Sequence, residues 1–245
     1  MATQNKARLA AWLIHLYTAS GAVAALFAFD YTATGEFRAA FIAMAFAIVI
    51  DSTDGPLARA VEIRAQLPFF DGALLDNIVD YLNYVAAPVF LLLRAELLTP
   101  GAAGLGVASF VMLASAYGFC RVDAKTADHY FRGFPSYWNL VAFYLFLFRW
   151  PPALNTLVVA LLALMVLLPI KFIYPNRTRP LRRLTLSLAA IWGVATIALL
   201  LQLPQCNRVL LYSSFVFVVY YFTMSLALQV RTARLTRATN LVLSD

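Results

Sequence analysis

Charged side chains are scarce in this sequence. Asp, Glu, Lys and Arg make up 13% of the 245 residues, whereas hydrophobic residues make up 62%. A soluble domain carries about a quarter charged residues, so this supply is too small to cover a water-exposed surface. The mean hydropathy is +0.77, and the apolar runs are long enough to cross a bilayer. The composition therefore excludes a soluble protein and indicates a polytopic membrane protein.

Cysteine and histidine are also rare, with two of each. Cys120 and Cys206 belong to no C-x-x-C pair and are too few for a framework of disulfides. A zinc site, which usually recruits Cys and His, is therefore not expected. Basic residues exceed acidic ones by seven charges. We attribute this excess to loops that fix topology and contact anionic membrane lipids, rather than to nucleic acid binding.

Apolar runs of about 20 residues predict an all-α fold of about eight transmembrane helices. The expected spans are about 9–29, 37–58, 73–97, 102–120, 136–150, 152–170, 183–203 and 207–229. Only Arg149–Pro152 separates the fifth span from the sixth. Most of the 19 Lys and Arg residues flank one set of helix ends, which places both termini in the cytoplasm. We expect one membrane domain over residues 1–245.

Four aspartates interrupt this apolar sequence in two pairs. Asp51 and Asp54 are three residues apart, and Asp76 and Asp80 are four apart, so each pair shares one face of a helix. A short connector sets the two helices side by side, where unpaired carboxylates would repel each other and lose solvation. Divalent cations remove both costs. Oxygen ligands favour two Mg²⁺ or Mn²⁺ ions over zinc.

Residues that suit a phosphate flank the aspartates. Gly55 follows Asp54, and Gly72 precedes Asp76 by four residues, so a ligand can approach the backbone closely at both glycines. Arg59 lies one turn beyond Gly55 and offers a planar, bidentate guanidinium. Together these residues favour a metal-bridged pyrophosphate and phosphoryl displacement. Acids inside a membrane also serve ion or proton pathways, so a transporter is a remote alternative.

The same stretch resembles the signature of the CDP-alcohol phosphotransferase family. That signature reads Asp-x2-Asp-Gly-x2-Ala-Arg and, after a gap, Gly-x3-Asp-x3-Asp. All eight fixed positions match: Asp51, Asp54, Gly55, Ala58, Arg59, Gly72, Asp76 and Asp80. The gap of twelve residues before Gly72 is similar to that of the bacterial phosphatidylcholine synthase branch.

The resemblance implies a role for each of these residues. The four aspartates would hold the metals, with Asp51 and Asp76 bridging them, and Asp80 would also be the general base. Because their titrations are coupled, the residues alone do not rank the four acids. The nucleotide and its pyrophosphate would be bound by Asp54, Gly55, Ala58, Arg59, Gly72 and Thr18. Ordinary packing of small residues between helices explains Thr18 equally well.

A polar and aromatic segment at 125–139 bears on the acceptor. Its run from Gly133 to Asn139 resembles a loop of the choline-using branch. A quaternary ammonium has no hydrogen-bond donor, so a site for it needs aromatic faces. The candidate rings are Tyr81, Tyr84, Tyr137 and Trp138. Tyr and Trp are also common at any membrane interface, which is the alternative for each of them.

The resemblance implies transfer of the phosphatidyl group of CDP-diacylglycerol to choline, with release of CMP. The site would face the cytoplasm from a bacterial inner membrane, surrounded by membrane lipids. Family members are often dimers, so a second copy of the chain is an expected partner. The nearest alternative is a sister enzyme that uses serine, inositol or glycerol phosphate. An anionic acceptor such as glycerol phosphate would need an additional basic cluster.

Overall fold

The computed structural model of the chain describes residues 2–124, 126, 130–174 and 182–242, with side chains between residues 5 and 229. These residues are predominantly helical, as the sequence predicted. They pack as two compact units, one within Met1–Phe119 and Ser136–Ala160 and the other within Cys120–Pro135 and Leu161–Asp245. The expectation of one membrane domain stays a prediction.

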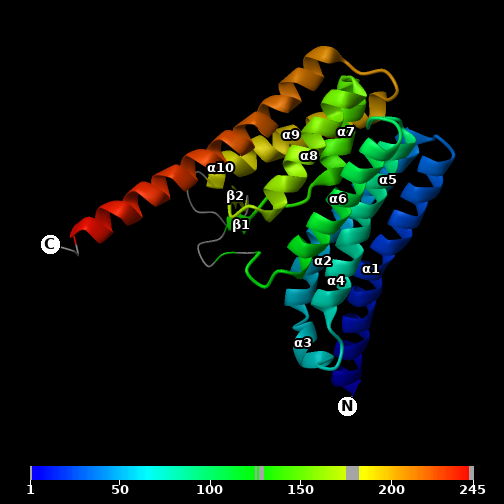
Figure 1. Cartoon of the computed structure of the whole chain (residues 1–245). Helices are drawn as coiled ribbons and strands as arrows, with labels where there is room; N and C mark the ends of the chain where they lie inside the picture. Colours follow the sequence, from blue (N-terminus) through cyan, green and yellow to red (C-terminus); the bar gives the residue numbers. More distant parts are fainter. Residues whose placement is uncertain (1, 125, 127–129, 175–181, 243–245) are drawn as a thin grey trace. The chain divides into compact units, whose positions relative to one another are not determined.

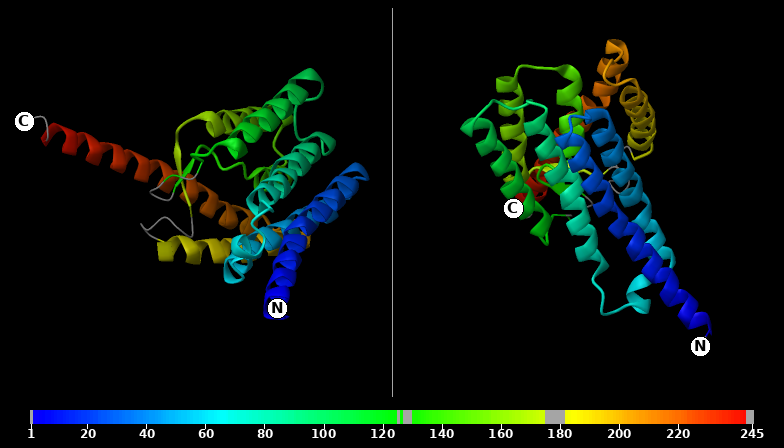
Figure 2. Two further views of the ribbon diagram at one scale, coloured as in Figure 1. Left: turned by 90° about the horizontal axis from the view of Figure 1, so that it is seen from below. Right: turned by 90° about the vertical axis from the view of Figure 1, so that its right-hand side faces the viewer.

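The first unit contains the helices that carry the aspartates. Its elements are α1 (Ala2–Ala33), α2 (Phe37–Ala60), α3 (Ile63–Gln66), α4 (Gly72–Asp80), the π-helical turn η1 (Tyr81–Ala86), α5 (Ala87–Arg94), α6 (Ala102–Cys120), α7 (Trp138–Phe148) and the first part of α8 (Pro152–Leu167). α1 packs against α2, α4, η1 and α5 (Figure 1). α3 lies beside the N-terminal end of α1 (Figure 2). α1 is therefore the central helix of this unit.

Small residues on α1 permit this close packing. Ala11, Ala25 and Ala28 are almost fully buried. At Gly21, an added Cβ would lie 2.6 Å from Cγ1 of Val79 in α4. In a bilayer no hydrophobic force drives helices together, and small residues let their backbones approach to van der Waals contact. Gly21 therefore sets how closely α4 approaches α1.

The turn η1 interrupts a predicted span directly after Asp80. α4, η1 and α5 follow one another without a gap, so together they form the helix expected at 73–97. Asn83 of η1 is buried, and its Nδ2 donates hydrogen bonds to the carbonyls of Gly21 (2.8 Å) and Val79 (3.0 Å). Single π turns insert one residue into a helix and occur frequently at functional sites. The hydrophobic pattern of the sequence does not predict this turn.

The second unit contains a short β ribbon, which adds two strands of three residues to a predominantly helical fold. Its elements are β1 (Tyr130–Arg132), the end of α8, β2 (Lys171–Ile173), α9 (Arg182–Gln202) and α10 (Arg208–Val242). The two strands are antiparallel, with Phe131 opposite Phe172. Gly133 follows β1 with φ +86°, and an added Cβ there would lie 2.2 Å from the carbonyl oxygen of Val166. Strands of three residues are too short to show the alternation that predicts a strand.

Side chains of α10 complete the ribbon. The backbone N–H groups of Lys171 and Ile173 donate to Oε1 of Gln229 and Oγ of Ser225, each at 3.1 Å. The hydroxyl of Tyr221 donates to the carbonyl of Ile173, also at 3.1 Å. These bonds satisfy backbone groups of β2, an edge strand that would otherwise leave them unpaired. Polar residues on an apolar helix therefore have a structural role here.

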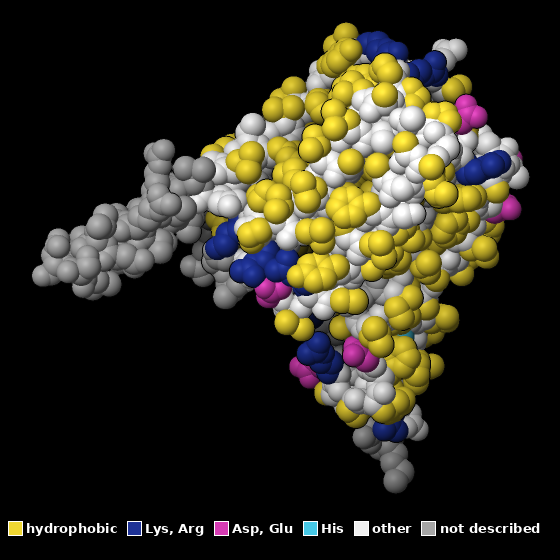
Figure 3. All heavy atoms as spheres, in the orientation of Figure 1, with side chains coloured by type: hydrophobic (Ala, Val, Ile, Leu, Met, Phe, Trp, Pro, Cys, Tyr) yellow, Lys and Arg dark blue, Asp and Glu magenta, His cyan; other side chains and the backbone are white. Residues whose placement is uncertain are grey.

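Five of the described helices are long and apolar enough to cross a membrane. They are Asn5–Ala33, Phe37–Ala60, Ala102–Cys120, Arg182–Gln202 and Arg208–Gln229. Hydrophobic side chains cover most of the face in Figure 3. The predicted break between the fifth and sixth spans is confirmed, since α7 ends at Phe148 and α8 begins at Pro152. The count of eight spans and the cytoplasmic termini stay predictions.

Candidate functional site

Three aspartates lie together in the first unit. Asp51 comes from α2, whereas Asp76 and Asp80 come from successive turns of α4. One carboxylate oxygen of each lies within 4.8 Å of the other two, and all three side chains are half-buried. α1 packs against both α2 and α4 and so holds the two helices near each other. The spacing of the acids predicted such a convergence for four aspartates, and three of them come together.

Asp54, the fourth aspartate, is held by α1. Its side chain is 5% exposed, and its Oδ2 accepts a hydrogen bond of 2.9 Å from Oγ1 of Thr18. One residue earlier on both helices, the hydroxyls of Tyr17 and Thr53 lie 2.8 Å apart. Asp54 lies outside the group of three, although its charge interacts with that of Asp51. Thr18, expected at the nucleotide, therefore orients Asp54 in this structure.

Tyr84 links η1 to the acids. Its hydroxyl donates a hydrogen bond of 2.6 Å to Oδ2 of Asp51. Its ring centroid lies 6.4 Å from that of Tyr137, and its hydroxyl interacts electrostatically with Asp80. Tyr84 therefore lies beside a carboxylate, and Tyr137, a second aromatic candidate for the acceptor, lies beside Tyr84. The sequence drew attention to the ring of Tyr84 and gave no sign of its bond to Asp51.

The other two aromatic candidates pack against α6. The hydroxyl of Tyr81 donates to the carbonyl of Met112 (2.9 Å), and its ring meets that of Phe119 edge-on. Trp138 has no exposed surface, and its Nε1 donates to Oγ of Ser115 (2.8 Å). Tyr81 and Trp138 therefore each donate a hydrogen bond to a residue of α6. Their part in acceptor binding stays a prediction.

The guanidinium of Arg59 lies over the backbone of Gly55, which is one helical turn earlier in α2. A Cβ at Gly55 would lie 3.3 Å from Nη1 of Arg59, so the glycine makes room for the guanidinium. The arginine side chain is exposed and can reach an anionic ligand. Ala58 instead packs against the buried cluster of Ala11, Ile63 and Leu67. Ala58 therefore ties the end of α2 to the connector, whereas Arg59 is the signature residue best placed for a phosphate.

Gly72 begins α4 against an aromatic cluster. A Cβ at Gly72 would lie 2.5 Å from Cε1 of His15. The buried His15 ring lies 4.4 Å from the ring of Phe70 and 6.1 Å from that of Trp12. Helix packing alone therefore requires a glycine at this position, whether or not a ligand also contacts it.

Asp71, which was not among the predicted site residues, caps the helix that carries Asp76 and Asp80. Its Oδ1 accepts hydrogen bonds of 3.0 Å from the N–H groups of Ala73 and Leu74. An aspartate directly before a helix is the signal that identifies such a cap. We expect Asp71→Ala to lower the free energy of unfolding by about 1 kcal/mol, measured by unfolding in detergent. Asp71→Asn keeps the acceptor and should match the unsubstituted protein. Equal losses in both variants would contradict a capping role.

The grouped carboxylates fit a divalent cation. Three negative groups at this separation repel one another unless positive charge or protons compensate them. Every candidate donor atom is a carboxylate oxygen, which Mg²⁺ and Mn²⁺ prefer as ligands. Tyr84 and Thr18 already orient two of the four acids through hydrogen bonds. A cation held here can offset the charge of a pyrophosphate beside Arg59.

Comparison with known proteins relates this geometry to a family. The sequence profile of CDP-alcohol phosphatidyltransferases matches residues 9–173. A phosphatidylcholine synthase of Legionella pneumophila is 38% identical over 222 residues, which cover 88% of this chain and 87% of that protein. One of Bradyrhizobium diazoefficiens is 40% identical over 191 residues, with 78% and 71% covered. One of Pseudomonas aeruginosa is 35% identical over 207 residues, with 84% and 86% covered.

Proposed function

The chain belongs to the CDP-alcohol phosphatidyltransferase family, and we propose that it transfers the phosphatidyl group of CDP-diacylglycerol to choline and releases CMP. The group of Asp51, Asp76 and Asp80, beside the rings of Tyr84 and Tyr137, carries this proposal. Carboxylates with divalent ions suit the pyrophosphate of the donor, and aromatic faces suit an acceptor cation that has no hydrogen-bond donor. The similarity to phosphatidylcholine synthases supports choline as the acceptor.

The grouped acids are the proposed ligands of Mg²⁺ or Mn²⁺. Asp51, Asp76 and Asp80 would hold two ions together with Asp54. When bound, the ions would offset the negative charge of the pyrophosphate and of the departing CMP. Arg59 would pair with the same diphosphate through its exposed guanidinium. Thr18 would keep Asp54 turned toward the donor.

Asp80 is the proposed general base. It takes the proton from the choline hydroxyl, and the oxygen forms a bond to the phosphorus that bears the diacylglycerol. The bond between that phosphorus and the bridging oxygen of the pyrophosphate breaks, and CMP leaves with the electron pair. The proton then passes from Asp80 to water. General-base catalysis of this kind contributes about 10²- to 10⁴-fold to the rate.

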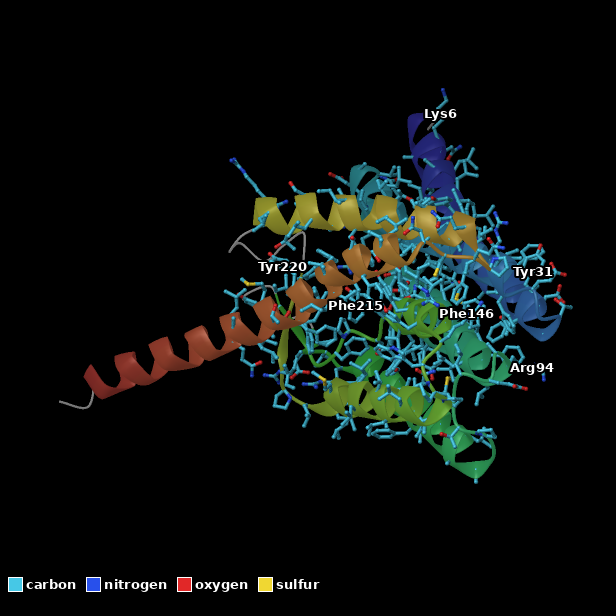
Figure 4. The ribbon with its side chains drawn as sticks, turned by 90° about the horizontal axis from the view of Figure 1, so that it is seen from above. Lys6, Tyr31, Arg94, Phe146, Phe215 and Tyr220 are labelled. Carbon is cyan, nitrogen blue, oxygen red and sulfur yellow. The ribbon has the colours of Figure 1, made fainter. Side chains whose placement is uncertain are left out.

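The acids lie toward one end of the first unit. With a rise of 1.5 Å per residue, Asp76 and Asp80 lie about 6 and 12 Å from the start of α4. Lys6 lies near one end of α1. Tyr31, near the other end of α1, and Arg94, the last residue of α5, lie at the opposite end of this unit (Figure 4). α3 contains Arg64 and packs against the Lys6 end of α1.

We propose that this basic end faces the cytoplasm of a bacterial inner membrane. Choline and CMP then exchange with the cytoplasm, and the lipid donor enters from the bilayer. We also propose that the protein forms a homodimer, because it belongs to a family whose members are often dimers.

The proposal is tested by CMP release from purified protein with CDP-diacylglycerol and Mn²⁺ in detergent. Choline, serine, inositol and glycerol 3-phosphate are supplied in parallel. Release that depends on choline is expected. Release with serine, inositol or glycerol 3-phosphate, but not with choline, would mean that the protein catalyses a sister reaction. No release with any acceptor, from folded and metal-loaded protein, would contradict the enzyme function.

A further inference from the structure

We propose that Tyr84 is a positioning residue whose hydroxyl holds Asp51 in the orientation that binds metal. The π turn η1 is the structural device that brings Tyr84 to Asp51. This inference rests on the proposed function, because it takes Asp51 as a metal ligand. It assigns to Tyr84 a role that depends on its hydroxyl, separate from any contact between its ring and the acceptor.

The bond between Tyr84 and Asp51 has the geometry of a strong contact. Its length of 2.6 Å lies in the range of hydrogen bonds from a hydroxyl to a charged carboxylate. It joins α2 to η1, which are separated in the sequence by α3, a connector and α4. Donors to a ligating carboxylate fix the direction of its remaining lone pairs, and their loss lowers metal affinity. Tyr84 is therefore placed to orient one acid of the group without entering the group itself.

The π turn determines where Tyr84 points. It begins directly after Asp80, the last residue of α4. A π turn accommodates one more residue than an α-helical turn, so the residues that follow Asp80 are rotated relative to their positions in an uninterrupted α-helix. Tyr84 lies within η1 and contacts Asp51 of the neighbouring helix from there. Tyr84 therefore contacts the group of acids from within the turn that follows Asp80.

An independent contact holds η1 in place. Asn83, 3% exposed, donates hydrogen bonds to the carbonyls of Gly21 and Val79. Gly21 admits this approach because an added Cβ would collide with Val79. Three residues earlier on α1, Thr18 donates to Asp54. One helix therefore orients Asp54 directly and supports, through Asn83, the turn that orients Asp51.

Tyr84→Phe tests this inference because it removes the hydroxyl and keeps the ring. The dissociation constant for Mn²⁺, measured from the electron paramagnetic resonance signal of free Mn²⁺, is expected to rise about 10- to 100-fold. The KM for choline is expected to change less than about twofold, because the aromatic face remains. In an Asp51→Ala background the same substitution should have no further effect on Mn²⁺ affinity, since the carboxylate that accepts the hydrogen bond is already lost.

Tyr220→Phe is the matched control. Its hydroxyl pairs with that of Thr185 (2.8 Å) within the second unit, so its loss should leave Mn²⁺ affinity unchanged. Asn83→Leu should weaken Mn²⁺ binding in the same direction as Tyr84→Phe. Unchanged Mn²⁺ affinity in Tyr84→Phe, or a change in the KM for choline alone, would overturn the inference. A protein that binds Mn²⁺ but releases no CMP with any acceptor would refute the proposed function and leave the Tyr84 comparison intact.

Discussion

Asp80→Asn is expected to lower kcat for choline-dependent CMP release by about 10²- to 10⁴-fold, the usual contribution of a general base. Asparagine has nearly the same size and cannot accept the proton of the choline hydroxyl. It also removes one negative charge from a group of three that lie within 4.8 Å of one another. The rate is measured with saturating CDP-diacylglycerol and Mn²⁺, so that weaker metal binding does not limit it.

The control for this variant is Asp30→Asn. Asp30 is an exposed residue of α1 near its C-terminal end, and it lies outside the group of acids. Its substitution makes the same chemical change and should leave kcat within about twofold, as expected for a surface position away from the site. Activity of Asp80→Asn at the level of Asp30→Asn would contradict the role of Asp80 as the base.

Removal of divalent metal is expected to abolish activity. The acids of α2 and α4 then have no cation to offset their charge or that of the pyrophosphate. Dialysis against a chelator should bring CMP release to background, and Mn²⁺ or Mg²⁺ should restore it. The metal should also stabilise the fold, because it binds the folded protein alone. At one hundred times its Kd, an ion adds about 2.7 kcal/mol.

Asp76→Asn distinguishes this site from other metal binding. Asp76 is one of the three grouped acids, so its loss should remove most of the stabilisation by Mn²⁺, measured as the shift of the unfolding midpoint. A full shift in Asp76→Asn would place the ion elsewhere. Full activity in the chelated protein would contradict the metal-dependent account as a whole.

The sequence predicted the acidic site to the extent that local spacing determines it. Asp76 and Asp80 share a face because they lie on successive turns of one helix. Their approach to Asp51 followed from the short connector, and the structure has these three together. The position of Asp54 was not predictable, because it depends on Thr18, which lies 36 residues away on α1. A hydrogen bond between distant helices leaves no periodic signal.

The fold was predicted where hydrophobic runs and prolines mark it. Pro151 and Pro152 separated α7 from α8, and Arg149, with φ +54°, ends α7 there. The β ribbon was missed because each strand has three residues and β2 depends on α10 for hydrogen bonds. The π turn was missed because a change of the backbone hydrogen bonds from i→i+4 to i→i+5 has no characteristic amino-acid composition. The hydrogen bond from Tyr84, which lies in this turn, to Asp51 was therefore not predictable from the sequence.

The proposed reaction joins choline to the phosphatidyl group of CDP-diacylglycerol. The most direct test reconstitutes the purified protein in vesicles that contain CDP-diacylglycerol, with Mn²⁺ and labelled choline outside. Labelled phosphatidylcholine and CMP should form in equal amounts, and neither should form without choline. Two results would contradict the account: release of CMP without a choline-containing lipid, or entry of labelled choline into vesicles that lack CDP-diacylglycerol.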